Sequence, residues 1–168
     1  MTIDKILVPL DGSDLAEAAL ETAIDLLTEH SAAMLLLLRA AEAPRSPGSN
    51  RTDEQARVVR EAESYLSGVA AGLRESGITR VKTSIWYGPA APTIVEAAEV
   101  EKVNLIVMST HGRSGVGRLI FGSVAESVLH GTRTPILLVR DISAPVLPLL
   151  GATEVRSTSE ASVPVGPA

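Results

Sequence analysis

Apolar runs and amphipathic segments alternate along the 168 residues of this chain. Short apolar or alternating segments at 5–10, 34–38, 81–87, 103–108 and 135–139 predict five β-strands. The run 34–38 is apolar at every position, which is typical of a strand in the middle of a parallel sheet. Longer segments between the runs carry apolar residues three and four positions apart, and these segments predict helices.

Local signals mark where these helices begin and end. Ser13 is expected to cap the first helix, and Gly77 is expected to end the second. The third helix is expected to open at Pro92 and the fourth at Ser123. The polar segment 41–53, which contains proline and glycine, is expected to form a surface loop.

This order of elements predicts a Rossmann-like α/β fold, an open, five-stranded, mainly parallel sheet with helices on both faces. The length fits one domain with a single core, which we place at residues 1–140. Residues 141–168 form a C-terminal tail whose first part is apolar and interrupted by prolines. We expect this tail to be flexible or to pack on the domain or on a partner subunit.

Composition argues against several function classes. The net charge is −5 and the chain has one Trp, two Tyr and one Phe, so we expect no binding of nucleic acid, which needs a basic face and stacking aromatics. The chain has no cysteine and three scattered histidines, which predicts no disulfide and no transition-metal site made by the protein. The longest apolar run is shorter than the ~20 residues of a membrane helix, and the N-terminus lacks a signal-peptide pattern. We therefore expect a soluble, cytoplasmic protein.

A glycine-rich run at 108–123, between the fourth strand and the fourth helix, carries the main functional signal. Gly112, Gly115 and Gly122 lie where the chain passes from strand to helix, and Arg113 adds positive charge. At such a junction, backbone N–H groups and the helix dipole can hold an anion such as phosphate. The run therefore predicts a phosphate-binding loop.

Three other glycine motifs do not fit this run. A Walker A loop needs a lysine where this chain has Arg118, and a dinucleotide loop needs a third glycine where it has Ile120. A nucleophile elbow needs one more residue between Gly112 and Gly115. His111 has no acidic partner nearby in the sequence, so we interpret it as a loop-shaping residue and assign no catalytic residue.

The chain resembles the universal stress protein family in three places. The pattern G-x-x-G-x9-G-[ST] of its ATP-binding branch is matched by Gly112, nine intervening residues and Gly122-Ser123, while Ser109 takes the place of the first glycine. Segments 5–13 and 134–139 resemble the same family, in the right order and at the right spacing. The resemblance covers the domain and leaves the tail outside.

The resemblance implies a strand order of 3-2-1-4-5, with ATP or a related adenine nucleotide at the switch point between the first and fourth strands. It also implies a homodimer formed through residues 136–139, and Mg²⁺ or Mn²⁺ bound through the phosphates. The nucleotide-binding residues that it implies are Pro9, Asp11, Ala40, Met108, Ser109, Gly112, Arg113, Gly115, Gly122, Ser123 and Val124.

Three of these residues keep two interpretations. Asp11 is either a turn residue or a contact for the adenine or ribose. Ser123 forms a capping box, Ser-x-x-Glu, with Glu126, and it could also bind phosphate: the hydroxyl would bind phosphate when ligand is present and cap the helix when it is absent. Ser109 weakens binding if its position requires a positive φ or direct contact with the ligand. It is tolerated, with a hydroxyl able to donate a hydrogen bond, if the backbone there is extended.

The resemblance favours a dimeric, nucleotide-binding regulatory module of the stress response. One alternative is a stress protein that binds no nucleotide and acts through protein contacts. Another is an enzyme, either a slow ATPase or an adenylyl-handling relative. No residue stands out as a catalytic base, so we expect at most slow, incidental hydrolysis of ATP.

Overall fold

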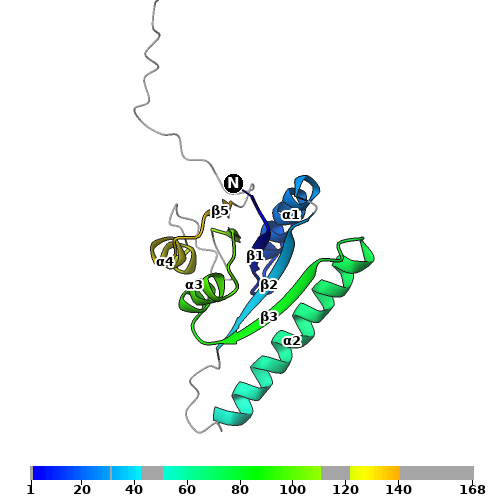
Figure 1. Cartoon of the computed structure of the whole chain (residues 1–168). Coiled ribbons are helices and arrows are strands. Elements are labelled where there is room, and N and C mark those ends of the chain that lie inside the picture. Colours follow the sequence, from blue (N-terminus) through cyan, green and yellow to red (C-terminus); the bar gives the residue numbers. More distant parts are fainter. Residues whose placement is uncertain (1, 31, 43–50, 111–121, 141–168) are drawn as a thin grey trace, which may run out of the picture.

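The computed structural model describes residues 2–30, 32–42, 51–110 and 122–140 (Figure 1). Its elements alternate between strand and helix as the sequence predicts. In chain order they are β1 (Lys5–Pro9), α1 (Asp14–Glu29), β2 (Met34–Ala41), α2 (Arg51–Glu75), β3 (Val81–Tyr87), α3 (Ala90–Val100), β4 (Leu105–Ser109), α4 (Ser123–Gly131) and β5 (Ile136–Val139). The tail at 141–168, and with it the expectation that it packs on the domain or a partner, lies outside the described residues.

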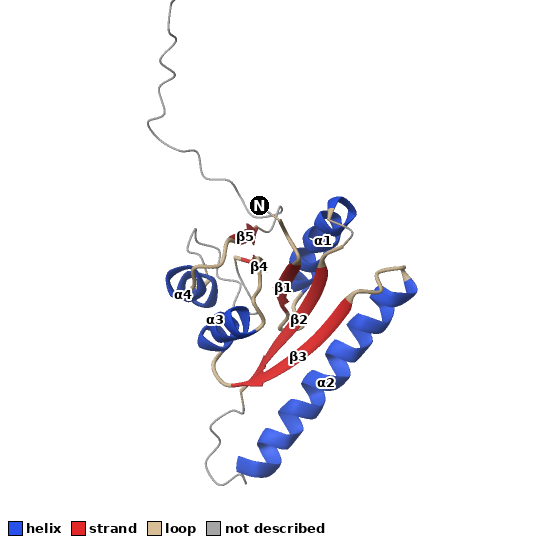
Figure 2. Cartoon of the chain, viewed as in Figure 1, coloured by secondary structure: helices blue, strands red, loops and turns tan. Residues whose placement is uncertain are grey.

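The five strands form one sheet in the order β3-β2-β1-β4-β5, and every neighbouring pair is parallel. Strand β1 lies at the centre, where Lys5 pairs with Met34 of β2 and Ile6 pairs with Leu105 of β4. Helices α1 and α2 lie on one face, and α3 and α4 lie on the other (Figure 2). The predicted α/β fold and strand order are therefore confirmed.

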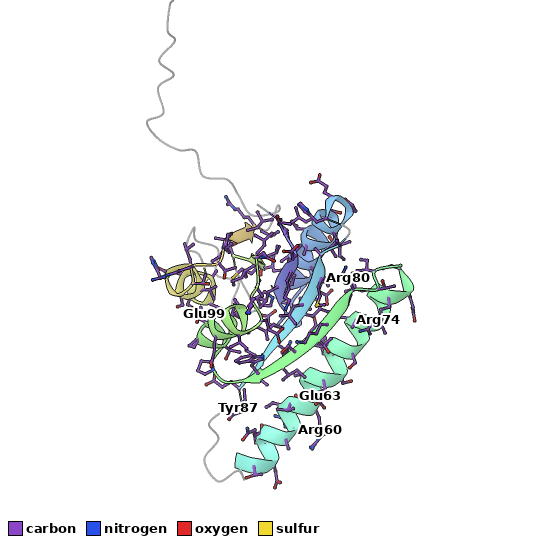
Figure 3. The ribbon with its side chains drawn as sticks, in the orientation of Figure 1. Arg60, Glu63, Arg74, Arg80, Tyr87 and Glu99 are labelled. Carbon is purple, nitrogen blue, oxygen red and sulfur yellow. The ribbon has the colours of Figure 1, made fainter. Side chains whose placement is uncertain are left out.

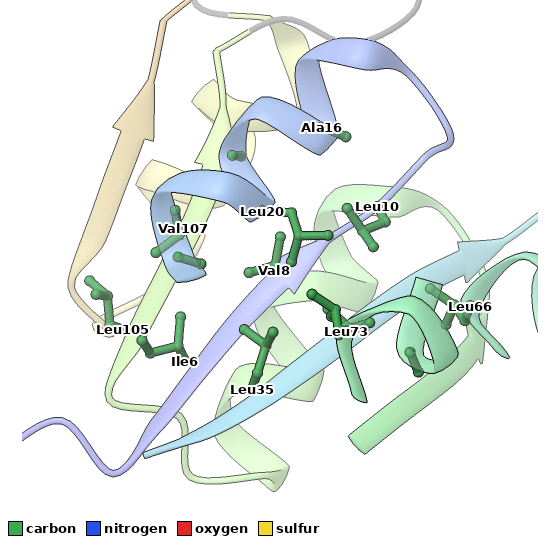
Figure 4. Close-up of a cluster of buried hydrophobic side chains, with 14 residues drawn as sticks. Ile6, Val8, Leu10, Ala16, Leu20, Leu35, Leu66, Leu73, Leu105 and Val107 are labelled. Atoms are coloured by element: carbon green, nitrogen blue, oxygen red, sulfur yellow. The ribbon is translucent and has the colours of Figure 1, made fainter. Parts of the chain in front are cut away.

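Two apolar cores hold the helices to the two faces of the sheet. On the first face, β1 and β2 alternate inward residues such as Val8 and Leu37, both fully buried (Figure 4). These pack against Ala19 and Leu20 of α1 and Leu66 of α2, and the small alanine lets α1 approach the sheet closely. The second core contains Leu7, Leu36, Leu38, Ile94, Ala97, Ile106, Met108, Ala125 and Val128.

The end signals of the first two helices are confirmed. The Ser13 hydroxyl oxygen accepts a hydrogen bond from the backbone N–H of Ala16 at 3.2 Å, which caps α1. Gly77 has φ +98°, and its N–H donates to the Arg74 carbonyl at 3.0 Å. Glycine adopts this conformation without the steric cost that a side chain would add, so α2 ends there.

Several boundaries differ from the sequence-based expectation. Helix α2 already begins at Arg51, inside the segment 41–53 that is expected to form a loop, and β4 covers Leu105–Ser109 instead of 103–108. Strand β2 continues to Ala41 because its pairing with β3 continues as far as Tyr87. Helix α3 begins at Ala90, two residues before Pro92. A proline within the first helical turn breaks no intrahelical hydrogen bond, because the N–H groups of that turn have no partner in the helix.

None of the described helices combines the length and the apolar composition needed to cross a membrane.

Candidate functional site

The centre of the sheet contains a switch point, because the chain leaves β1 toward β2 on one side and later returns to β4 on the other. Pro9 is the last residue of β1 and Ser109 is the last residue of β4. The carboxyl ends of these adjacent parallel strands lie at the same edge of the sheet. Open α/β sheets bind ligands in the crevice at such an edge.

Asp11 lies just beyond β1, in a turn that its own side chain stabilises. Its Oδ1 accepts hydrogen bonds from the Ser13 N–H at 3.0 Å and from the Ser13 hydroxyl at 2.6 Å. Gly12 between them has φ +79°, a conformation that residues with a side chain rarely adopt. The turn interpretation of Asp11 is therefore confirmed as local structure. Both hydrogen bonds use one carboxylate oxygen, so the turn does not occupy the whole carboxylate.

Helix α4 begins on the other side of the switch point without a side-chain cap. Gly122, with φ −52° and ψ 144°, occupies the N-cap position, and Ser123 is the first helical residue. The expected capping box of Ser123 and Glu126 is therefore wrong. The Gly122 N–H donates to the Thr110 carbonyl, and the Gly122 carbonyl accepts from the Glu126 N–H at 3.0 Å, so the helix starts one residue earlier than that box requires.

No side chain of the described residues caps the first turn of α4, whose backbone N–H groups have no partner within the helix. Ser123 is exposed, and Val124 is 37% exposed. The partial positive charge of a helix N-terminus makes such donors suitable for an anion. Gly112, Arg113 and Gly115, which the sequence adds to this site, lie outside the described residues.

The structure shows whether the backbone of Ser109 has a positive φ or is extended, which is one part of the question that the sequence left open. Ser109 pairs with Val139 as the last residue of β4, and the N–H of the buried Thr110 donates to the Val139 carbonyl at 3.0 Å. Among the described residues, Lys102 alone has a positive φ without being glycine. Ser109 is therefore extended, and its position does not need the conformational freedom of glycine.

Ala40 and Met108 lie on the same face of the sheet as the second core. Ala40 belongs to β2, where it pairs with Trp86 of β3, so it does not follow the strand as the sequence suggested. It is partly exposed, whereas Met108 is 5% exposed and packs in the core. Ala40 therefore offers a small, partly exposed apolar side chain near the edge, whereas Met108 belongs to the buried core.

A side-chain cluster beside the Asp11 turn was not identified from the sequence. The Nη1 of Arg39 donates to the Leu10 carbonyl at 3.4 Å, and its guanidinium carbon lies 5.2 Å from the centre of the Tyr65 ring. The Tyr65 hydroxyl donates to Glu17 Oε1 at 3.5 Å. Burial, followed by the Glu17 carboxylate, raises the pKa of Tyr65 above its ordinary value. The available signal was a single charged residue, Arg39, within an otherwise apolar strand.

Among the described residues, no group of three or more histidine, cysteine or acidic side chains could hold a metal ion.

The sheet order and its central switch point define a doubly wound α/β protein. Residues 2–140 match the model of the Universal stress protein family, and the chain belongs to that family. One relative, the universal stress protein MJ0531 of Methanocaldococcus jannaschii, is 32% identical over 139 residues, which cover 81% of each chain. The solved structure of MJ0577 from the same organism is 28% identical, covers 84% of this chain and 98% of its own, and has a TM-score of 0.73.

Two solved structures that share the fold are described with a nucleotide. A universal stress protein in complex with cAMP is 24% identical, with a TM-score of 0.57, and covers 83% of this chain and 98% of its own. An Arabidopsis thaliana protein of the family with AMP bound is 13% identical, with a TM-score of 0.62, and covers 83% of this chain and 93% of its own.

Proposed function

We propose that this protein binds ATP at the switch point between β1 and β4 and acts as a dimeric regulatory module of the stress response. The observation that carries the proposal is the first turn of α4, which no described side chain caps and which begins at the edge where β1 and β4 end. A phosphate chain needs several donors and positive potential in one place, and an uncapped helix N-terminus supplies both. The glycine pattern before the helix allows the backbone to approach such a ligand.

The residues at this edge fit the two ends of the nucleotide. The first turn of α4, from Gly122 to Val124, would hold the phosphates together with Gly112, Arg113 and Gly115 of the loop. Bound Mg²⁺ or Mn²⁺ would be held through the phosphates.

The nucleoside would lie toward β1 and β2. Asp11 would accept hydrogen bonds from the ribose or adenine, and Ala40 would contact the flat base through its small side chain. Pro9, Met108 and Ser109 would line the crevice between these two ends. The cAMP and AMP bound by the two proteins of the same fold favour an adenine nucleotide as the ligand class.

The proposed dimer uses β5, which lies at one end of the sheet order. An edge strand presents unpaired backbone groups that a second copy can extend. Leu137 within Ile136–Val139 is 37% exposed, which would suit apolar contact across such a pairing. A regulatory protein that forms this dimer without binding nucleotide remains the second candidate, and the binding experiment below separates the two.

The test is calorimetric titration of the purified protein with ATP up to millimolar concentration, with mass analysis of any small molecule that copurifies. Gly122→Val should abolish binding, because the added side chain crowds the phosphates while φ −52° is open to valine. Gly72→Val is the matched control, since an added Cβ there meets nothing within 4 Å. A wild-type protein that neither carries nucleotide nor binds ATP would refute the proposal, and binding that survives Gly122→Val would place the nucleotide elsewhere.

A further inference from the structure

The guanidinium of Arg39 lies beneath the turn that carries Asp11. Arg39 extends from β2 on the same face as Leu35 and Leu37, toward α1 and α2. Its Nη1 reaches the carbonyl of Leu10, the residue that precedes Asp11, at 3.4 Å. The same atom would lie 3.3 Å from a Cβ added to Gly12, so it also contacts the turn at its tightest residue.

Helix α2 holds this guanidinium from the other side. The Tyr65 ring lies 5.2 Å from the guanidinium carbon, which is the distance of a cation–π contact. The Tyr65 hydroxyl donates to Glu17 of α1 at 3.5 Å, so the ring is itself fixed between two helices. The ion pairs formed among the described residues do not include Arg39. Among the contacts of the described residues, its guanidinium is held by the turn and by the ring.

We propose that Arg39 is a positioning residue: anchored on Tyr65, it holds the turn from Leu10 to Ser13 and so keeps Asp11 in the geometry that contacts the nucleotide. The inference rests on the proposed binding of ATP and deepens it, because it assigns the nucleoside end of the site a support that comes from α2. Arg39 acts through Asp11 and does not itself touch the ligand.

The cation–π contact depends on the side-chain chemistry of both Arg39 and Tyr65. Lysine keeps the charge of Arg39 but lacks the planar group that stacks on a ring while it donates sideways. Arg39→Lys should therefore loosen the turn almost as much as Arg39→Met. Tyr65→Phe keeps the ring and should preserve the turn, whereas Tyr65→Leu removes the stack and should loosen it.

The first experiment needs no nucleotide. The Ser13 N–H donates to Asp11 Oδ1, so its hydrogen exchange reports whether the turn is held. Arg39→Met should accelerate that exchange by about tenfold, the effect of losing one cation–π contact and one hydrogen bond. Arg60→Met is the matched control, because Arg60 is exposed on α2 (Figure 3). Unchanged exchange in Arg39→Met would overturn the inference.

The second experiment is a double-mutant cycle on ATP affinity, with thermal stability measured alongside. Arg39→Met should weaken binding about tenfold in the wild-type background and less than about twofold in Asp11→Ala, because a residue that acts through Asp11 has nothing left to position. A general structural role predicts the same loss in both backgrounds, and that result would overturn the inference. Wild-type affinity in Arg39→Lys would overturn it too, because charge alone would then suffice. If the wild type binds no ATP, the proposed function fails, and the exchange of Ser13 still decides whether Arg39 holds the turn.

Discussion

Gly12 offers a sharp test of the turn at the nucleoside end of the site. Gly12 and Gly77 both have positive φ, at +79° and +98°. An alanine in this conformation costs roughly 1–2 kcal/mol, partly offset by about 0.5 kcal/mol because alanine restricts the unfolded chain. Both Gly12→Ala and Gly77→Ala should therefore lose about 1 kcal/mol from backbone strain alone.

The surroundings of the two glycines differ. A Cβ on Gly12 would lie 3.3 Å from Arg39 Nη1 and 4.0 Å from Tyr65 Cε2, whereas a Cβ on Gly77 meets nothing within 4 Å. Arg39 must shift by a few tenths of an ångström in Gly12→Ala, which weakens its cation–π contact and costs at most about another 0.5–1 kcal/mol. The expected free energy of unfolding is therefore lower by about 1–2 kcal/mol in Gly12→Ala, and by about 1 kcal/mol in Gly77→Ala.

Urea unfolding, with the slopes compared to check that the unfolded states match, gives both values. Titration with ATP then separates stability from binding. Gly12→Ala should weaken ATP binding about tenfold, a change of about 1.4 kcal/mol, and Gly77→Ala should leave it unchanged. Equal losses of stability and equal ATP affinities in the two variants would refute the idea that the turn and Arg39 depend on each other.

Three further changes test other parts of the molecule. Glu101→Gln removes a carboxylate that accepts hydrogen bonds from Lys82 and Lys5. These bonds lower the pKa of Glu101, and the bond from Lys82 has the larger effect. The ionised Glu101 should stabilise the wild-type fold by about 0.5–1 kcal/mol above pH 4.5, and this stabilisation should disappear as the pH falls through the lowered pKa. The unfolding curves of wild type and variant should therefore converge in acid. Leu37→Ala empties a fully buried position and should cost about 2–4 kcal/mol in urea unfolding, with a smaller loss counting against a close-packed first core. If the protein forms the proposed dimer through β5, Leu137→Glu should sediment as a monomer where the wild type is a dimer, and a variant that stays dimeric would exclude that edge.

The elements of the fold could be predicted from the sequence because their signals are local. Ser13 caps the helix that follows it, and Gly77 ends the helix before it, through atoms only a few residues away. The order of the strands could not be predicted from local signals, because apolar periodicity does not say which parallel strands are neighbours. The predicted order came from the resemblance to the family. The extension of β2 to Ala41 depends on pairing with β3, which no local pattern reveals.

The site could be predicted only where the contacting residues are close to each other in the sequence. The Asp11–Ser13 hydrogen bonds follow from turn chemistry, but the contact of Arg39 with Tyr65 joins two elements that no spacing rule connects. The predicted cap of α4 was wrong for the same reason, because the start of the helix depends on a contact between residues far apart in the sequence. Ser123 and Glu126 satisfy the capping pattern, yet the hydrogen bond from the Gly122 N–H to the Thr110 carbonyl sets the start of the helix.

Ser109 allows a final test of whether this chain departs from the family pattern in function or only in sequence. Because its backbone is extended, Ser109→Gly should gain no conformational relief and should lose about 0.5–1 kcal/mol, the cost of a glycine within a strand. Thr83→Gly, at an exposed position of β3, measures that cost where no ligand is expected. ATP affinity should stay within about twofold of wild type in both variants. A large gain of affinity in Ser109→Gly alone would mean that the serine side chain, rather than its backbone, obstructs the ligand.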